Sequence, residues 1–213
     1  MPRRFALHLS LSGRKCLVVG GGEVGWRKAR SLADCGARVT VVGERFCRGL
    51  RRSRRVRRVA RRFRPSDLRG VWVVVAATDD QALNRAVAEQ AHRQGLLVNV
   101  ADDAEAGNFI VPAQFTRGPL AVSISTEGAS PLLARKIKER LSALLDETYA
   151  EWLKLLAEFR PRARARLSRP EDRRRLFDQL TSEAVYSILK EEGLGAARRY
   201  AHRALERLAE GDR

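Results

Sequence analysis

The fold is decided by the stretch Val18-Val19-Gly20-Gly21-Gly22-Glu23-Val24-Gly25, where an apolar strand runs into the pattern Gly-x-Gly-x-x-Gly. A helical pattern follows. In this order Gly20 permits the tight turn, Gly22 lets the backbone approach a pyrophosphate, and Gly25 allows close packing of helix on strand. The free N–H groups at the helix start favour a phosphate. The stretch predicts a dinucleotide site; a tight turn without a ligand is the alternative.

The end of the next strand carries a second signal. Arg38-Val39-Thr40-Val41-Val42 is apolar and β-branched, and it leads into Gly43-Glu44-Arg45. Glu44 lies about 20 residues beyond the glycine loop, the spacing of an acidic residue that accepts hydrogen bonds from the ribose of a dinucleotide. This favours NAD over NADP as the cofactor, although Arg45 can hold the 2′-phosphate of NADP.

The totals describe a globular protein. The chain has 213 residues, of which 44% are apolar, and no apolar run approaches the roughly 20 residues of a membrane span. The N-terminus leads directly into the first strand, so we expect no cleavable signal and a cytoplasmic protein. The three cysteines and three histidines show no metal-ligand spacing. We therefore predict no metal site, and we expect Cys16 and Cys35 to be small core residues.

A net charge of +17 is the other large feature of the composition. Much of it lies in the arginine-rich run 48–64. Such a charge attracts polyanions, including nucleic acid, anionic membranes and small molecules with several carboxylates. The alternative is a solvated face in a chain that uses arginine throughout. The run has no interleaved aromatic residues on which bases could stack, so we do not expect nucleic acid as a partner.

The first half of the chain alternates strands with helices. This order predicts an α/β fold, a Rossmann-type doubly wound parallel sheet, because buried parallel strands appear as continuous Val/Leu runs. We expect strands at 16–19, 39–42, 56–63, 71–76 and 96–100, and helices at 23–35 and 81–94.

Two of these strands end in polar residues. The strand at 71–76 leads into Thr78-Asp79-Asp80, where Asp80 is expected to cap the next helix. The strand at 96–100 leads into Asp102-Asp103. Ligands of open parallel sheets bind at the carboxyl ends of the strands, and a carboxylate there can take a proton from a substrate. Solvated loop residues are the alternative for Asp102 and Asp103.

The second half has a different pattern. We divide the chain into a dinucleotide-binding domain at 1–112, a small α+β dimerisation segment at 113–147 and a helical C-terminal domain at 148–213. A strand at 119–126 precedes a helix at 132–145, with Ser130 as N-cap and Pro131 in the first turn. One strand and one helix cannot bury both faces, so a second copy of the chain is the expected partner. Pro161 and Pro170 predict a break in the helices at 160–170.

Five ordered motifs resemble the siroheme synthase family, in its precorrin-2 dehydrogenase and sirohydrochlorin ferrochelatase module. They cover about residues 3 to 145 and comprise Gly20-Gly21-Gly22-x-Val24 with Arg27-Lys28-Ala29, Ala76-Ala77-Thr78-Asp79-Asp80, Asn99-Val100-x-Asp102, Asn108-Phe109-x-x-Pro112-Ala113, and Gly118-Pro119-Leu120-x-x-x-Ile124-Ser125-Thr126-x-Gly128-x-Ser130-Pro131-x-Leu133-Ala134.

The resemblance implies an NAD-dependent oxidation of precorrin-2 to sirohydrochlorin by a homodimer. Many members then insert Fe²⁺ to give siroheme. It implies that Asp102 is the key residue for dehydrogenation. It also implies a dinucleotide held by Gly20, Gly22, Glu23, Val24, Gly25, Glu44, Arg45 and Thr78, and a tetrapyrrole near Asn108, Ser125 and Thr126. Precorrin-2 carries eight carboxylates, which suits a cationic protein.

The chain departs from the family pattern at three positions that bear on its sites. Glu44 stands where many members have proline or an uncharged residue, so its role at the ribose comes from the general dinucleotide fingerprint. Gly25 replaces a common alanine, which is harmless. Glu127 replaces a frequent glycine beside Thr126, which bears on the ferrochelatase activity more than on the dehydrogenase activity. The rival function is a dinucleotide-sensing regulatory module that binds nucleic acid through the arginine-rich face.

Overall fold

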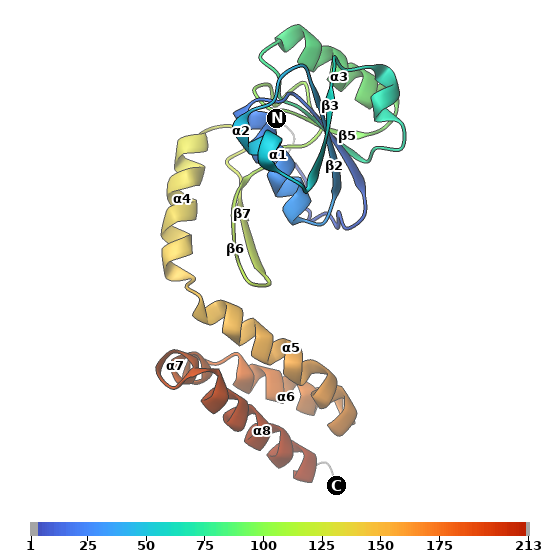
Figure 1. The fold of residues 1–213 in the computed structure, drawn as a ribbon. Coiled ribbons are helices and arrows are strands. Elements are labelled where there is room, and N and C mark those ends of the chain that lie inside the picture. The colour runs from blue at the N-terminus through green and yellow to red at the C-terminus, as the bar shows by residue number, and fades with distance from the viewer. Residues whose placement is uncertain (1–3, 212–213) are drawn as a thin grey trace. The chain divides into compact units, whose positions relative to one another are not determined.

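The computed structural model describes residues 4–211, and contacts divide the chain after Val111 into two compact units. The first unit is a five-stranded parallel sheet with the strand order β3-β2-β1-β4-β5 (Figure 1). Its strands are β1 (Lys15–Val19), β2 (Arg38–Gly43), β3 (Val56–Ala60), β4 (Val73–Ala76) and β5 (Leu97–Val100). The predicted Rossmann-type α/β fold is confirmed.

The two faces of this sheet carry separate apolar cores. Helix α1 (Glu23–Asp34) buries Ala29 and Ala33 against one face, and helix α3 (Gln81–Arg93) buries Val87 and Ala91 against the other. Successive strand side chains point to opposite faces. Because both faces are covered, every residue of β4 is buried, which explains its unbroken Val-Val-Val-Ala sequence.

The connections around the edge strand β3 differ from the prediction. A short helix α2 (Arg48–Arg52) precedes β3, and the strand ends at Ala60 rather than at Phe63. Beyond it the chain turns into a 3-10 helix η1 (Pro65–Leu68), whose Asp67 accepts a hydrogen bond from the backbone of Arg64. Strand β3 ends where its neighbour does, because Ala60 pairs with Gly43, the last residue of β2.

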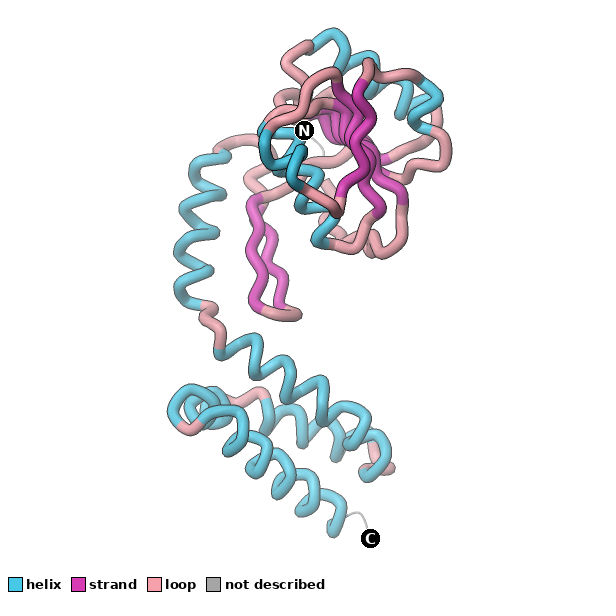
Figure 2. The backbone as a smooth tube through the Cα atoms, in the orientation of Figure 1, coloured by secondary structure: helices cyan, strands magenta, loops and turns pink. Residues whose placement is uncertain are grey.

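The second unit combines an antiparallel hairpin with helices, as the tube in Figure 2 shows. Its elements are β6 (Ala113–Arg117), β7 (Leu120–Ile124), α4 (Pro131–Leu144), α5 (Thr148–Arg166), α6 (Pro170–Leu180), α7 (Glu183–Glu191) and α8 (Gly193–Gly211). The predicted cap is present, because Ser130 Oγ accepts a hydrogen bond from the backbone of Leu133 at 3.1 Å. Helices α5 to α8 share one apolar core.

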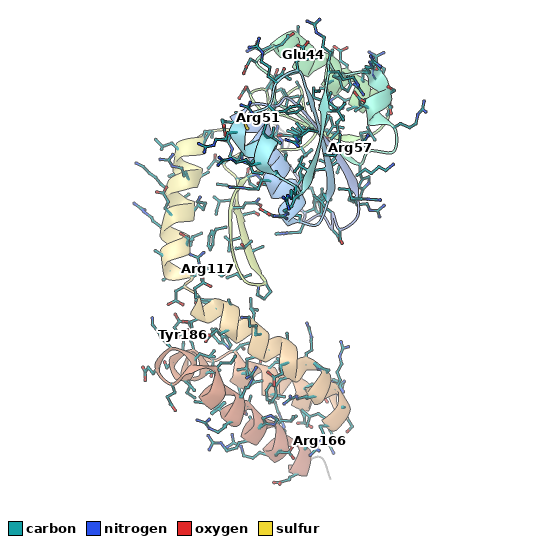
Figure 3. All side chains as sticks on the ribbon, viewed as in Figure 1. Glu44, Arg51, Arg57, Arg117, Arg166 and Tyr186 are labelled. Carbon is teal, nitrogen blue, oxygen red and sulfur yellow. The ribbon has the colours of Figure 1, made fainter. Side chains whose placement is uncertain are left out.

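Arg117 joins the hairpin to the helices that follow it. Its guanidinium donates to the carbonyl of Ser142 at 3.1 Å and lies 3.3 Å from the carboxylate of Glu147. Figure 3 labels this side chain. Strand β6 is not among the strands expected from the sequence, although its residues alternate between half-buried and exposed side chains. The strand exists because β7 pairs with it in register from Ala113↔Ile124 onward.

The predicted break at 160–170 is wrong in its first half, because α5 continues through Pro161. Proline removes one helical hydrogen bond and crowds the carbonyl four residues earlier, which costs about 3 kcal/mol or more. Leu155, Phe159 and Ala163 are fully buried on one stripe of this helix. Burial of a large apolar side chain contributes roughly 1.5–3 kcal/mol, so packing outweighs the local cost.

The two cysteines expected in the core differ. Cys16 is buried in β1, and this burial raises the pKa of its thiol to about 11. Cys35 is exposed at the end of α1, so the expectation of a core residue there is wrong. It follows the last helical residue, where the chain turns through Gly36 before it enters β2.

Candidate dinucleotide and proton-transfer site

Three glycines are predicted to form the loop between β1 and α1. Two of them have no space for a side chain, and the third has space. A Cβ at Gly20, which has a φ of +121°, would overlap the carbonyl of Ala77. A Cβ at Gly25 would overlap the carbonyl of Gly20, as the close packing of helix on strand requires. Gly22 has an ordinary φ of −75°, and its Cβ would meet no atom within 4 Å.

The open space at Gly22 is informative, because neither its φ nor any contact with residues 4–211 requires a glycine there. Gly22 is the N-cap of α1, and no side chain caps this helix. The first N–H groups of a helix have no partner within it, and they favour an anion. The arrangement fits the pyrophosphate of a dinucleotide, which needs both a close backbone approach and free donors.

The predicted residues at the start of α1 have different environments. Glu23 is exposed, whereas Val24 is half-buried and packs against the core on the α1 face of the sheet. Both belong to the first turn of the helix, next to the open position at Gly22. Their assignment as dinucleotide contacts stays a prediction.

Glu44 and Arg45 follow the carboxyl end of β2, and both are exposed. The carboxylate of Glu44 accepts a hydrogen bond from Arg62 Nε at 3.2 Å. Arg62 follows β3, and no spacing rule singles it out in the sequence. Its guanidinium offsets the charge of the carboxylate that a ribose would meet at this strand end.

Thr78 lies beyond the end of β4 and is held by Asn84 of α3. The Thr78 hydroxyl and its backbone N–H both donate to Asn84 Oδ1, at 2.7 and 3.1 Å, and Asn84 Nδ2 donates back to the Thr78 carbonyl at 2.9 Å. Asp80 caps α3 by accepting from the backbone of Leu83 at 3.0 Å, as predicted. These bonds tie the turn that contains Thr78 to the start of α3.

Asp102 and Asp103 follow β5, and the structure gives them separate roles. Asp103 Oδ1 accepts from the backbone N–H groups of Glu105 and Ala106, at 3.2 and 3.1 Å, so it shapes the loop. The exposed carboxylate of Asp102 forms no hydrogen bond or ion pair with any residue in the range 4–211. Both aspartates line a pocket of about 140 Å³ together with Gln81, Asn84, Arg85 and Val100.

Two asparagines hold the chain that leaves this pocket. Asn108 Oδ1 accepts from the backbone of Val98 and Asn108 Nδ2 donates to the carbonyl of Leu96, both at 2.8 Å. Asn99 Nδ2 donates to the carbonyl of Phe109 at 3.1 Å. The buried Oδ1 of Asn99, in contrast, has no hydrogen-bond donor among the described residues. The side chain of Asn108 therefore has a structural use in this chain, beside its predicted contact with substrate.

The other two predicted substrate residues lie in the second unit. Ser125 Oγ accepts from the backbone of Glu127 at 3.1 Å, and Thr126 Oγ1 accepts from the backbone of Ser130 at 3.2 Å. Glu127 has a φ of 52°, a left-handed conformation that a glycine adopts more easily. The frequent glycine of the family thus has a backbone explanation, and the side chain of Glu127 is tolerated at some strain.

The arginine-rich run is partly used in ion pairs. Arg55 binds Asp34 at 2.7 Å, and Arg61 binds both carboxylate oxygens of Asp67, at 2.8 and 2.6 Å. The hydrogen bonds from Arg61 hold the pKa of Asp67 below its usual range. Figure 3 labels two further members of the run, Arg51 of α2 and Arg57 of β3.

Residues 4–211 offer neither a cluster of metal ligands nor a membrane span. Among them, no three His, Cys, Asp or Glu side chains gather as a metal site would need. Across the same part of the chain, no helix is both long and apolar enough to cross a bilayer.

Three family models match consecutive parts of the chain. Residues 7–113 match the model described as "Putative NAD(P)-binding". Residues 117–144 match the central region of sirohaem biosynthesis proteins, and residues 148–205 match the sirohaem synthase dimerisation region.

Two siroheme synthases are similar to this chain over most of its length. Siroheme synthase of Methylobacillus flagellatus is 36% identical over 96% of this chain and 44% of its own length. That of Chromobacterium violaceum is 38% identical over 91% of this chain and 42% of its own length. The chain thus spans less than half the length of these curated relatives.

A solved structure matches over its whole length. SirC, a precorrin-2 dehydrogenase, is 31% identical and superposes with a TM-score of 0.74, over 96% of this chain and 100% of that chain. These similarities extend through both units, and they join the NAD(P)-binding region to the two sirohaem synthase regions in one order. The chain therefore belongs to the siroheme synthase family, in its precorrin-2 dehydrogenase module.

Proposed function

We propose that this chain oxidises precorrin-2 to sirohydrochlorin with NAD⁺. One observation carries the proposal: the carboxylate of Asp102 has no partner among the described residues, and it lies at the same sheet edge as the open glycine loop. The carboxyl ends of parallel strands share one edge, which is where ligands of this fold bind. A free carboxylate beside a dinucleotide loop is what a dehydrogenation needs.

The chemistry removes two hydrogens from the macrocycle. Bound NAD⁺ supplies an acceptor for one of them as a hydride. Asp102 takes the other as a proton and passes it to water, so charge and atoms balance. The chain contributes orientation: the glycine loop holds the pyrophosphate, Glu44 and Arg45 meet the adenosine ribose, and Thr78 forms the turn next to the pocket of Asp102.

The substrate side of the proposal uses residue types that suit a polycarboxylate. We assign Asn108, Ser125 and Thr126 to the tetrapyrrole, together with the general positive charge of the chain, +17, which favours a substrate of eight carboxylates. We also assign the protein to the cytoplasm. These assignments rest on the family and on the residue types.

The proposed assembly is a homodimer. Residues 148–205 match a dimerisation region, and α4 exposes large apolar side chains in the isolated chain. Leu132, Leu133 and Leu144 are 57%, 51% and 69% exposed. A second copy of the chain that covers them would remove this apolar surface from water. Light scattering should give twice the chain mass of 23.9 kDa.

An anaerobic assay tests the reaction. The purified protein is mixed with precorrin-2 and NAD⁺, and NADH and sirohydrochlorin are followed by absorbance. We expect one NADH for each sirohydrochlorin. No NADH with NAD⁺ or NADP⁺ would overturn the proposal. Fe²⁺ added afterwards as a second substrate tests iron insertion, for which the macrocycle nitrogens are the ligands and Asp102 is the acceptor of the displaced protons.

The Asp102→Asn variant separates the chemistry from binding. It should lose NADH formation by about 10²-fold or more, the usual contribution of a general base, while its affinity for NAD⁺ stays unchanged. Asp178→Asn is a matched control, because Asp178 is an exposed aspartate of α6 in the other unit. Near-normal turnover in Asp102→Asn would remove the carboxylate from the mechanism.

A further inference from the structure

Lys28 is a half-buried cation near the pocket of Asp102, and the ion pairs of this unit do not use it. Its ammonium forms no hydrogen bond or ion pair with any other residue of the described chain. Burial lowers the pKa of Lys28, the neighbouring Arg27 lowers it further, and the carboxylate of Asp102 acts in the opposite direction. The charge that favours the ionised form of Lys28 is therefore that of Asp102.

The helix places Lys28 on the side of β4 and β5. With about 3.6 residues per turn, Lys28 and Trp26 lie on opposite flanks of the stripe that buries Gly25 and Ala29. Trp26 packs on Gly49 of α2, which belongs to the β2–β3 half of the sheet. The flank of Lys28 consequently faces the other half, where β5 ends and the loop with Asp102 begins.

The face of β5 that is turned towards α1 carries a hydrogen-bond acceptor to which no described residue donates. Leu97 and Ala101 pack against the core on the α1 face, and strand side chains alternate, so Asn99 points to that face too. Asn99 is 5% exposed, and its Oδ1 lacks a donor among the described residues. An unsatisfied buried acceptor destabilises the fold, and a lysine ammonium has three donors that could satisfy it.

We propose that Lys28 is a positioning residue of the active site, whose ammonium attracts and orients the Asp102 carboxylate and can donate to Asn99 Oδ1 when substrate covers the pocket. The inference rests on the proposed function. In the open pocket water screens the pair. A bound macrocycle excludes that water, and the attraction between the two charges then becomes several-fold stronger.

The other charges around Asp102 do not replace this role. Asp103 of the same loop is a like charge, and Arg85 of α3 lies 3.6 Å from Asp103 rather than from Asp102. Arg27, the neighbour of Lys28 on α1, is exposed. Lys28 is the half-buried cation on the α1 side of the pocket, so its removal should change the ionisation of Asp102 specifically in the complex.

The test compares Lys28→Met with Lys28→Arg, and uses Lys154→Met, an exposed lysine of α5, as the matched control. In Lys28→Met the acidic limb of the kcat profile should move to higher pH by roughly half a unit or more. The kcat/KM profile, which reports the free enzyme, should move less. Lys28→Arg should restore the wild-type limb, and all variants should bind NAD⁺ as the wild type does.

Three results would overturn the inference. An unmoved kcat profile in Lys28→Met would show that Lys28 does not act on Asp102. A raised KM with an unmoved profile would make it a contact to a substrate carboxylate instead. A lowered melting temperature with lost NAD⁺ binding would make it structural; we expect the melting temperature to stay level or rise, because a desolvated charge is removed. Wild-type protein that forms no NADH would overturn the proposed function, whatever the variants do.

Discussion

The hydroxyl of Thr78 donates a 2.7 Å hydrogen bond to the side-chain oxygen of Asn84, and the amide nitrogen of Asn84 returns a bond to the Thr78 carbonyl. This closed pair fixes the turn after β4 to the first helical turns of α3. Asn84 is 3% exposed, so its polar atoms have no water to replace these partners. The cofactor edge of the sheet is thus held by a buried amide.

Removal of this amide should affect both stability and binding. Asn84→Ala leaves the backbone N–H of Thr78 without its acceptor, and should destabilise the protein by about 1–3 kcal/mol. NAD⁺ affinity should fall as well, because the turn loosens. Thermal unfolding and titration calorimetry measure the two effects. As a control, Gln94→Ala removes an exposed amide at the C-cap of the same helix and should do neither. Unchanged unfolding in Asn84→Ala would contradict the structural role.

The glycine loop gives a paired prediction. Gly20→Ala should fold poorly, because its Cβ would overlap the carbonyl of Ala77 at a φ of +121°. Gly22→Ala should fold normally, since its Cβ meets open space, yet it should weaken NAD⁺ binding by obstructing the pyrophosphate. Circular dichroism and nucleotide titration separate the two effects. If Gly22→Ala bound NAD⁺ normally, the pyrophosphate would have to lie elsewhere.

Cofactor choice should depend on the pair of Glu44 and Arg62. Because Arg62 offsets the charge of Glu44, the variant Glu44→Gln should gain affinity for NADP⁺, whose 2′-phosphate can then bind the released guanidinium. Arg62→Gln should have the opposite effect and bind NADP⁺ more weakly than the wild type. The ratio of the two dissociation constants, for NADP⁺ and NAD⁺, is the measurement. A ratio that neither substitution changes would place the adenosine ribose away from this strand end.

The loss of folding stability at low pH should depend in part on Asp67. Its pKa is lowered in the folded protein by the hydrogen bonds from Arg61, so the ionised form stabilises the fold. This stabilisation is present above the ordinary value of 3.8 and is lost as the pH falls through the lowered folded pKa. Asp67→Asn should therefore be less stable than the wild type at pH 7. The two proteins should converge in urea unfolding experiments once the pH falls below the lowered pKa of Asp67. A constant difference at all pH values would exclude the ionised carboxylate as the cause.

The parts of the fold that can be predicted from the sequence are those with strong local signals. The tight turn of the glycine loop, the buried strand predicted at 71–76 and found at 73–76, and the cap at Asp80 depend on neighbouring residues, and they are confirmed. The passage of α5 through Pro161 depends on distant partners in α6 to α8, which a local pattern does not contain, whereas strand β6 depends on its pairing with the adjacent strand β7.

The residues of the candidate site likewise differ in whether a local sequence signal predicts them. The place of Asp102 directly after a strand makes it a candidate, but only the resemblance to the family separates it from Asp103. Asn84 escapes such a search, although a polar residue on the buried stripe of Val87, Ala88 and Ala91 is itself a signal. Arg62 has no local signal, because its contact with Glu44 exists only when β3 lies beside β2. Contacts between residues of neighbouring strands can be predicted only when the pairing of those strands is already known.

Pro161 has a consequence for how the C-terminal helices form. A helix with an internal proline is a poor helix by itself, since its nucleation is already unfavourable and one hydrogen bond is missing. Helix α5 gains its stability only when Phe159 and Ala163 meet their partners from α6 to α8. The four helices should therefore assemble in one concerted step, and a truncation that removes α8 should leave α5 largely unfolded rather than as a free-standing rod.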